Sequence, residues 1–369
     1  MPIRYLCEFK MNAKISPTKI GITSGDPNGI GIETVLRVFD DPRMFDIATP
    51  VLYATPGLVE AVAATMGEEL KVETKVIEGG DKAVARTLNI VAIQEEAFVP
   101  QWGEVSAEAG TFAGRSLEAA VSDLASTKVD VLVTAPIHKD AMRNSGFKFP
   151  GHTEYLQNMA NVEEVLMLLC ADDLRIGVAT GHIALKDVSA ALSTAVIRKK
   201  ISLMNDSLMR DFEIPTPRIA VLGLNPHASD NGLMGDEEKK IILPVIRELA
   251  AEGIQVMGPY AADGFFGSGA YRSFDGVLAM YHDQGLAPFK ALSFGAGVNF
   301  TAGLPIVRTS PDHGTGFDIA GQAKASGDSM RAAIYMARDV RASRKNHRQY
   351  ASNPLEITSK HRRDDDRRR

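Results

Sequence analysis

Three histidines each follow an apolar, β-branched segment that predicts a strand. His182 comes after RIGVATG, His227 after RIAVLGLNP and His282 after GVLAMY. Because ligands bind at the carboxyl ends of strands in open α/β sheets, these imidazoles can meet at one edge of a sheet. A lone histidine of this kind is more often a hydrogen-bonded structural residue, but three together favour a divalent metal with an open coordination position. Zn, Co, Mn and Mg are all possible, and imidazole ligands favour Zn or Co.

Two cations and an amide lie in FKALSFGAGVNFTAGLPIVRTS, at Lys290, Asn299 and Arg308. Short strand and turn pieces separate them, so they could meet on one anionic group, with arginine supplying a planar fork and lysine a point charge. As isolated residues they would be solvated surface charges. The next segment, PDHGTGFDIAG, has a glycine spacing that suggests a loop whose backbone closely approaches a flat or polyanionic ligand.

Two further motifs each admit a structural and a functional interpretation. In FPGHTEYL, His152 and Thr153 precede a helix, which Thr153 could cap, but beside the other histidines they become candidate substrate contacts. TSGDPNGIGIE, residues 23–33, is a glycine-rich turn between a strand and a helix. Its glycine spacing fits neither G-x-G-x-x-G nor the P-loop, so a tight turn and a ligand loop remain equal alternatives.

The elements that must position these residues alternate between short apolar runs and helical patterns, which is typical of βαβ units and a mostly parallel sheet. Strands are predicted at residues 19–23, 51–54, 71–77, 129–134, 165–170, 175–180, 218–222, 254–257, 276–281 and 297–300. The clearest helix covers residues 194–212, with apolar side chains recurring at helical spacing. Other helices are predicted at residues 107–126, after Gly235, and at residues 329–345.

Composition and charge limit the class of protein. The 369 residues allow two domains or one large one, and the balance of 45% hydrophobic residues with 41 Lys and Arg and 46 Asp and Glu excludes disorder and fibres. Residues 341–369 carry ten Lys or Arg and four acids, or +6, so the rest of the chain carries −11 of the total of −5. Such a body offers no general field for nucleic acid or an anionic membrane, and an anionic ligand needs local cations.

Cysteine usage and hydropathy predict a cytoplasmic location. The two cysteines, Cys7 and Cys170, cannot form a disulfide framework in a chain of this length, which indicates a reducing compartment. The N-terminal segment has no apolar run of signal-peptide length, and no run approaches the roughly 18 apolar residues of a membrane span. Residues 1–17 and 346–369 are predicted to be disordered ends.

Several long motifs identify a family resemblance. GDPNGIGIE, TAPIHK, FPGHTEYL, ATGHIALKD, GLNPHASDNGLMGDEE, YHDQGLAPFK and VNFTAGLPIVRTSPDHGTGFDIAG occur in this order over about residues 18–340. Together they resemble the 4-hydroxythreonine-4-phosphate dehydrogenase family of pyridoxal phosphate biosynthesis. The resemblance implies a two-lobed α/β fold like that of isocitrate and isopropylmalate dehydrogenases, with mostly parallel sheets and an active-site cleft between the lobes. Residues 18–145 and 285–345 would form a discontinuous first lobe, and residues 146–284 the second.

The resemblance also implies roles for individual residues. One divalent metal, Zn, Co or Mg, would bind at His182, His227 and His282, in agreement with the strand-end argument. The implied substrate contacts are His152, Thr153, Lys290, Asn299 and Arg308. DHGTGFDIAG is similar to the HGSAPDIAG loop that holds the nicotinamide cofactor in isocitrate and isopropylmalate dehydrogenases, so NAD or NADP would contact His313, Gly314 and Asp318. Members of the family are homodimers with the active site at the subunit interface, and by position His282 would come from the partner.

The implied reaction is the NAD(P)- and metal-dependent oxidation of 4-phosphooxy-L-threonine to a 3-keto acid, which decarboxylates to 3-amino-2-oxopropyl phosphate. The metal would lower the pKa of the substrate hydroxyl and polarise the new ketone. A general base must take the alcohol proton, and the candidates are Asp263, Asp283 and Lys139. Asp283 could equally be a residue that orients a metal-binding histidine.

Three alternatives stay open. A paralogue could oxidise 4-phospho-D-threonate, 4-phospho-D-erythronate or a dihydrodiol carboxylate with the same metal and cofactor chemistry. A metal-dependent hydrolase or aldolase would use the three histidines without a nicotinamide; GTGFDIAG argues against it, and NAD(P) binding would distinguish the two. A non-catalytic phosphometabolite-binding protein would leave the open metal position without a use.

Overall fold

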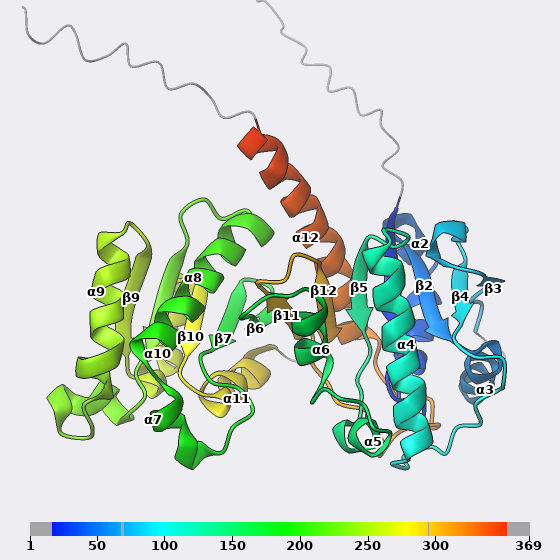
Figure 1. Cartoon of the computed structure of the whole chain (residues 1–369), viewed down its shortest axis with the longest axis horizontal. Helices are drawn as coiled ribbons and strands as arrows, with labels where there is room; N and C mark the ends of the chain where they lie inside the picture. The colour runs from blue at the N-terminus through cyan, green and yellow to red at the C-terminus, as the bar shows by residue number, and fades with distance from the viewer. Residues whose placement is uncertain (1–16, 68–69, 294, 353–369) are drawn as a thin grey trace, which may run out of the picture.

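The computed structural model describes residues 17–67, 70–293 and 295–352, and in them twelve strands form one sheet (Figure 1). The strand order is β3-β4-β2-β1-β5-β12-β11-β6-β7-β10-β8-β9. Only the pairs β12–β11, β11–β6 and β6–β7, at the centre, are antiparallel. The predicted α/β class with a mostly parallel sheet is therefore confirmed.

The strands have the following bounds: β1 (Thr18–Thr23), β2 (Ala48–Ala54), β3 (Thr74–Ile77), β4 (Leu88–Ala92), β5 (Val131–Thr134), β6 (Leu166–Ala171), β7 (Leu174–Val178), β8 (Arg218–Leu222), β9 (Gln255–Tyr260), β10 (Gly276–Ala279), β11 (Val298–Ala302) and β12 (Arg308–Pro311). The helices are α1 (Gly31–Phe39), α2 (Met44–Ile47), α3 (Pro56–Met66), α4 (Ala107–Ala125), α5 (Lys139–Asn144), α6 (His152–Met159), α7 (Val188–Ala191), α8 (Thr194–Asp211), α9 (Leu243–Ala251), α10 (Ala262–Gly267), α11 (His282–Ser293) and α12 (Asp328–Ser352). A π-helical turn at Glu238–Ile242 leads into α9, and 3-10 turns occur at Gly80–Lys82, Leu185–Asp187 and Ala270–Ser273.

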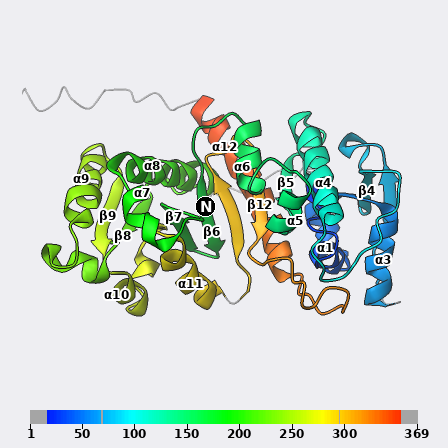
Figure 2. The ribbon, with the colours of Figure 1, turned by 60° about the horizontal axis from the view of Figure 1, so that its bottom comes forward.

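The sheet runs through both of the segments expected to form separate lobes. β12 and β11 come from the C-terminal part of the expected first lobe, and β11 pairs with β6 of the expected second lobe. Figures 1 and 2 both place β12 and β6 near the middle of the molecule, with α3 and α9 at opposite ends. The largest cluster of buried apolar side chains likewise includes residues from both halves, such as Ile20, Phe300 and Ile219. The centre of the sheet is thus where the two halves share a core.

The predicted strands correspond to ten of the observed ones, and β4 and β12 were missed. Each missed strand contains a buried polar residue that interrupts the apolar pattern. In β4 the Asn89 amide donates to the carbonyl oxygens of Pro50, Val84 and Thr87, so a buried asparagine is satisfied inside a strand. β12 begins with Arg308, which is only 3% exposed.

The C-terminal helix is longer than the sequence predicts. Helix α12 runs to Ser352 rather than ending at residue 345, so the expectation of a disordered end is wrong for residues 346–352. Asn346 donates to the Glu213 carboxylate, and no proline interrupts the helix before Pro354. Residues 1–16 and 353–369 lie outside the described part of the chain. No helix in the described part has the length and apolar character needed to cross a membrane.

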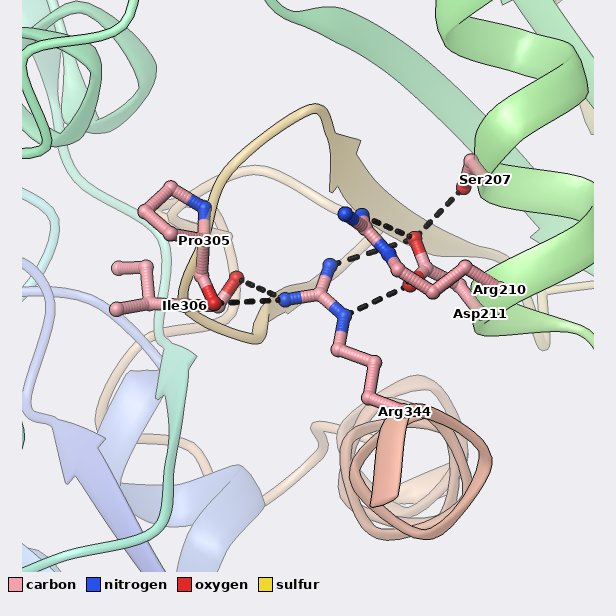
Figure 3. Close-up of polar contacts among 6 residues, drawn as sticks. All are labelled: Ser207, Arg210, Asp211, Pro305, Ile306 and Arg344. Atoms are coloured by element: carbon pink, nitrogen blue, oxygen red, sulfur yellow. Dashed lines mark hydrogen bonds and ion pairs between the residues drawn. The ribbon is translucent and has the colours of Figure 1, made fainter. Parts of the chain in front are cut away.

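A buried ion pair fixes α12 to α8 (Figure 3). Asp211, at the end of α8, accepts hydrogen bonds from Arg344 at 2.7 and 3.3 Å, from Arg210 at 2.8 and 3.1 Å and from Ser207 at 2.8 Å. Arg344 also donates to the carbonyl oxygens of Pro305 and Ile306 at 3.1 and 2.9 Å. Because these carbonyls directly precede β12, the network fixes the approach to Arg308.

Candidate active site

One cavity of about 380 Å³ lies beside the central strands. Its walls come from the loop after β5 and the start of α5, the start of α6, β6, the loop after β7, α11, β11, β12 and the loop that follows β12. The side chains on it that can carry charge or bind metal are Lys139, Lys290, Arg308, Glu154, Asp312, His152, His182, His282 and His313. The three cations outnumber the two carboxylates, whereas the body of the chain carries a net negative charge. The cavity is therefore suited to an anionic ligand.

Two of the three predicted metal ligands meet in this cavity. β7 and β10 are parallel neighbours, and their carboxyl ends deliver His182 and His282 to the same edge, where the ring centroids lie 5.4 Å apart. The backbone N–H groups of Ala179 and Thr180 donate to the carbonyl oxygens of Ala279, the last residue of β10, and Met280, which follows it, and these bonds hold the two loops together. The strand-end argument therefore succeeds for this pair.

The tautomer of His282 and the lowered pKa of His182 suit metal binding. His282 Nδ1 lies 2.7 Å from Asp283 Oδ1; a carboxylate can only accept, so Nδ1 carries the hydrogen and Nε2 is left for a ligand. Burial lowers the pKa of His182, and the nearby charge of Lys139 and the second imidazole lower it further. A neutral imidazole is the form that binds a cation. Asp283 is thus placed to orient His282.

His227 does not line this cavity. It is exposed in the Pro226–Gly232 turn, where residues 227–231 all have left-handed φ values between 45° and 72°. In the part of the chain that the structure describes, no group of three histidine, cysteine or acidic side chains is close enough to hold a metal ion. One copy of the chain therefore supplies two imidazoles at one point and the third on a separate exposed loop.

The predicted substrate contacts all line the cavity: His152, Thr153, Lys290, Asn299 and Arg308. Arg308 is buried, which lowers its pKa to about 10, and its hydrogen-bond partners in the chain are uncharged. Two buried atoms on the wall, His152 Nε2 and Asn299 Oδ1, have no partner among the described residues. Since buried polar atoms are normally satisfied, their position fits a polar ligand. Gly151, not Thr153, occupies the N-cap of α6.

The proposed bases are placed differently from one another. Lys139 lines the cavity, whereas Asp263 is exposed on α10 and does not. The sequence analysis missed Asp312, which directly follows β12 and lines the cavity. Burial raises its pKa against the opposing effects of Lys290, His313 and His282. Its position directly before the glycine-rich HGTG segment, in which His313 and Gly314 were candidate cofactor contacts, could have identified Asp312 as a site residue.

The candidate cofactor loop is held by the glycine-rich turn at residues 23–33. His313 and Gly314 line the cavity, and His313 Nε2 is buried without a partner among the described residues, which fits a polar cofactor group. Asp318 is exposed further along the same loop and does not line the cavity. Ile30 N donates to Thr315 O at 3.0 Å, and a Cβ on Gly29 would lie only 2.6 Å from that oxygen. The glycine is therefore needed for close backbone packing. This favours a structural turn over a ligand loop.

Comparison with known proteins agrees with the motifs. The family model described as pyridoxal phosphate biosynthetic protein PdxA matches residues 46–337. A 4-hydroxythreonine-4-phosphate dehydrogenase of Bacteroides thetaiotaomicron is 45% identical over 94% of this chain and 95% of its own length. The crystal structure of a 4-hydroxythreonine-4-phosphate dehydrogenase from Klebsiella pneumoniae has a TM-score of 0.77 at 35% identity and covers 89% of this chain and 98% of that one.

A more distant structure shares the fold. A terephthalate 1,2-cis-dihydrodiol dehydrogenase from Burkholderia xenovorans has a TM-score of 0.58 at 27% identity and covers 88% of this chain and 98% of that one. The family match extends over most of the chain, and the motifs of the cavity lie within it. The chain belongs to the PdxA family of pyridoxal phosphate biosynthetic proteins.

Proposed function

We propose that the protein is a dehydrogenase that oxidises 4-phosphooxy-L-threonine with NAD or NADP in pyridoxal 5'-phosphate biosynthesis. The product is the 3-keto acid, which loses carbon dioxide to give 3-amino-2-oxopropyl phosphate. The observation that carries the proposal is a single cavity that combines two facing imidazoles with three cations, in a chain 45% identical to a protein named for this activity.

The residues on the cavity wall fit a divalent cation and a nicotinamide cofactor. When bound, a divalent cation such as Zn, Co or Mg would lower the pKa of the substrate hydroxyl and polarise the ketone, and the nicotinamide would accept the hydride. His182 and His282 would hold the cation, and Asp283 would keep the His282 ring in its tautomer. His313 and Gly314 would face the nicotinamide dinucleotide, with Asp318 at the exposed end of the same loop.

The chain's own residues would bind the substrate and move its proton. Lys290 and Arg308 would hold the phosphate and carboxylate, while Thr153 and Asn299 would orient the remaining polar groups. Asp312, with its pKa raised by burial, would accept the alcohol proton. Lys139, whose charge is close enough to lower the pKa of His182, would stabilise negative charge on the ketone oxygen as carbon dioxide leaves.

The position of the cavity supports the proposed cleft between two lobes. Lys139, Lys290 and Arg308 come from the segments of the first lobe, and His152, His182 and His282 from the second. Two cysteines are too few for a disulfide framework in a chain of this length, and Cys170, the one in the described part of the chain, is a buried thiol, which supports a cytoplasmic enzyme.

We further propose a homodimer in which a second copy completes the site. Because His182 and His282 already adjoin in one chain, the geometry favours His227, rather than His282, as the imidazole contributed by the other copy. Two apolar surfaces are exposed beside these histidines. One, near His182 and His282, contains Ile183 at 44% exposure and Leu185 at 72%; the other, after the His227 turn, contains Leu233 at 80%. In a two-fold dimer the Leu233 surface of each copy would pack against the Ile183–Leu185 surface of the other, so the contact would form twice.

Leu233→Asp should convert the dimer to monomer and weaken metal binding, because a charge would have to be buried in the apolar contact. Size-exclusion chromatography with light scattering measures the first effect, and metal titration the second. Val99→Asp is the matched control, since Val99 is 77% exposed and lies outside both surfaces. A Leu233→Asp variant that remained dimeric would contradict this interface.

Lys290→Ala should raise KM for the phosphorylated substrate roughly tenfold to a hundredfold with a smaller change in kcat, because it removes one cation from the anion-binding wall. Lys290 is exposed on α11, so the melting temperature should hardly change. Steady-state kinetics and a thermal melt test both statements. An unchanged KM would remove Lys290 from the anion site.

The function is tested by following NAD(P)H formation by the purified protein, with and without divalent metal, across a panel of substrates. The panel contains 4-phosphooxy-L-threonine, 4-phospho-D-threonate, 4-phospho-D-erythronate and a dihydrodiol carboxylate. The last is included because of the similarity to the terephthalate dihydrodiol dehydrogenase. The proposal expects the highest kcat/KM with 4-phosphooxy-L-threonine; a preference for another acid, or no nicotinamide binding, would overturn it.

A further inference from the structure

We propose that Thr134 and Thr301 are positioning residues. They hold the Arg308 guanidinium and, through it, fix His152 as a neutral imidazole that presents its Nε2–H to the cavity as a hydrogen-bond donor. That this donor meets an oxygen of the phosphorylated substrate rests on the proposed function, whereas the arrangement of the four side chains does not.

The guanidinium is held by hydroxyl groups on both neighbouring strands. Arg308 lies on β12 between β5, which ends at Thr134, and β11, which carries Thr301. Its Nε and Nη2 donate to Thr134 Oγ1 at 2.9 and 2.7 Å, and its Nη1 donates to Thr301 Oγ1 at 3.1 Å. The exposed fractions of the three residues are between 0 and 3%, so water does not compete for these bonds.

The next contact determines the tautomer of His152. Arg308 Nη2 lies 3.3 Å from His152 Nδ1. A guanidinium can only donate, so Nδ1 must be the acceptor and cannot carry hydrogen. The proton of the neutral ring is then on Nε2, the buried atom on the cavity wall that has no partner among the described residues. Burial and the charge of Arg308 both disfavour a second proton, and they hold the pKa of His152 well below its usual range.

A count of donors shows how the ligand is recognised. The contacts with Thr134, Thr301 and His152 use four of the five N–H groups of Arg308, which leaves one on Nη1. The Nε and Nη2 edge of the guanidinium, which could otherwise bind an anion with two hydrogen bonds, therefore faces Thr134. The charge of Arg308 and the N–H of His152 are therefore what the side chains offer the cavity, while the fifth guanidinium N–H has no partner among the described residues. The cavity thus selects a group with acceptor oxygens, such as phosphate or carboxylate, and discriminates against a group that can only donate there.

Because the hydroxyl acceptors of Thr134 and Thr301 are uncharged, the positive charge of Arg308 stays available to a ligand. A carboxylate at residue 134 or 301 would form a salt bridge with Arg308 and neutralise it, whereas a threonine hydroxyl satisfies its hydrogen bonds and leaves the charge for the ligand. Among the described residues Arg308 forms no ion pair, although the charge of Glu154 on the same cavity opposes the lowering of its pKa by burial. A buried cation without a direct counter-charge is costly to the free protein, so an anion that binds beside it should stabilise the fold.

The test is NMR of protein labelled with ¹⁵N-histidine, with the His152 signals assigned by their loss in His152→Gln. We expect neutral, Nε2-protonated His152 from pH 6 to 8 in the substrate-free protein. An Nδ1-protonated or charged ring would overturn the proposal. Thr134→Val and Thr301→Val, made separately, should shift the ring toward a mixture of tautomers, and Thr134→Ser should restore the single form; an unchanged ring in both valine variants would also overturn it.

Thr309→Val is the matched control for damage to the fold. Thr309 is a buried β12 threonine whose hydroxyl bonds to Ala333 O instead of Arg308, so its loss should leave the His152 signals unchanged. Inorganic phosphate should raise the melting temperature of wild type and Thr309→Val, and less so that of Thr134→Val. In kinetics, Thr134→Val should lower kcat/KM by roughly tenfold to a hundredfold, mainly through KM.

These readouts separate the inference from the proposed function. The expected tautomer and variant response, found in a protein that oxidises none of the panel acids, would support the positioning roles and refute the substrate. Oxidation of 4-phosphooxy-L-threonine by a protein whose His152 is protonated on Nδ1 would support the proposed substrate and refute the positioning roles.

Discussion

His282→Ala should lower kcat/KM with the preferred substrate by about a thousandfold or more, the largest loss of activity expected for any single side chain in the cavity. The imidazole lies beside His182, with a ring centroid distance of 5.4 Å, and its Nδ1 is held by Asp283, so its removal leaves one imidazole in that chain to bind the cation. The side chain is 35% exposed and lies outside the main apolar core, so the fold should persist. NAD(P)H formation, a metal titration and a thermal melt measure the three effects.

Two variants show whether the loss arises from metal binding. Asp283→Asn keeps the ring but weakens its orientation, and should lower metal affinity by roughly tenfold to a hundredfold. His347→Ala removes an exposed imidazole of α12 that does not line the cavity, and it should change neither activity nor metal affinity. If His282→Ala kept full activity in metal-depleted buffer, the histidine pair would not be a metal site.

The periodicity of the sequence was sufficient to predict the class of fold because most strands are apolar runs. β8 was predicted with its observed bounds, and the buried stripe of α8 includes Ile197, Ile201 and Met204 as the helical spacing requires. The pattern failed where a strand carries a satisfied polar side chain, as in β4 with Asn89 and β12 with Arg308. It failed also at the end of α12, because the contacts that stabilise the last turns, such as Asn346 with Glu213, are tertiary.

Residue type predicted the side chains that line the cavity better than the residues that hold them. Lys290, Arg308, His182 and His282 were selected because their chemistry is specific, and all four line the cavity; strand ends predicted the location of His182 and His282 only. Thr134 and Thr301 were not found, because a threonine in a strand is ordinary and its role appears only when β5, β12 and β11 become neighbours. The separation of His227 from the other two histidines also depends on the path of the Pro226–Gly232 turn, which strand ends do not determine.

Asp211→Asn should destabilise the protein by about 3–5 kcal/mol, the largest loss of stability expected from a substitution outside the apolar core. The carboxylate side chain is 0% exposed and Arg344 is 8% exposed, so the variant leaves a buried cation without its counter-charge. Arg344 Nη1 would still be held by Pro305 and Ile306, whose carbonyls cannot neutralise it. Urea unfolding measures the free energy. Arg338→Met, in the exposed Arg338–Asp339 pair of the same helix, is the matched control and should cost less than about 1 kcal/mol.

The same pair predicts a pH dependence with a definite sign. Burial raises the pKa of Asp211, but the hydrogen bonds from Arg210 and Arg344 outweigh it, so the folded-state pKa lies below the ordinary value of an aspartate carboxyl, 3.8. The unfolded chain therefore binds the proton more tightly than the folded one, and stability falls as the pH drops. The stabilisation by this carboxylate should be complete above about pH 5 and lost as the pH falls from about 4 through the folded-state value. The difference in unfolding free energy between wild type and Asp211→Asn should therefore be constant from pH 6 to 8 and shrink below pH 4; a difference that grew on acidification would show that Asp211 is protonated in the folded protein.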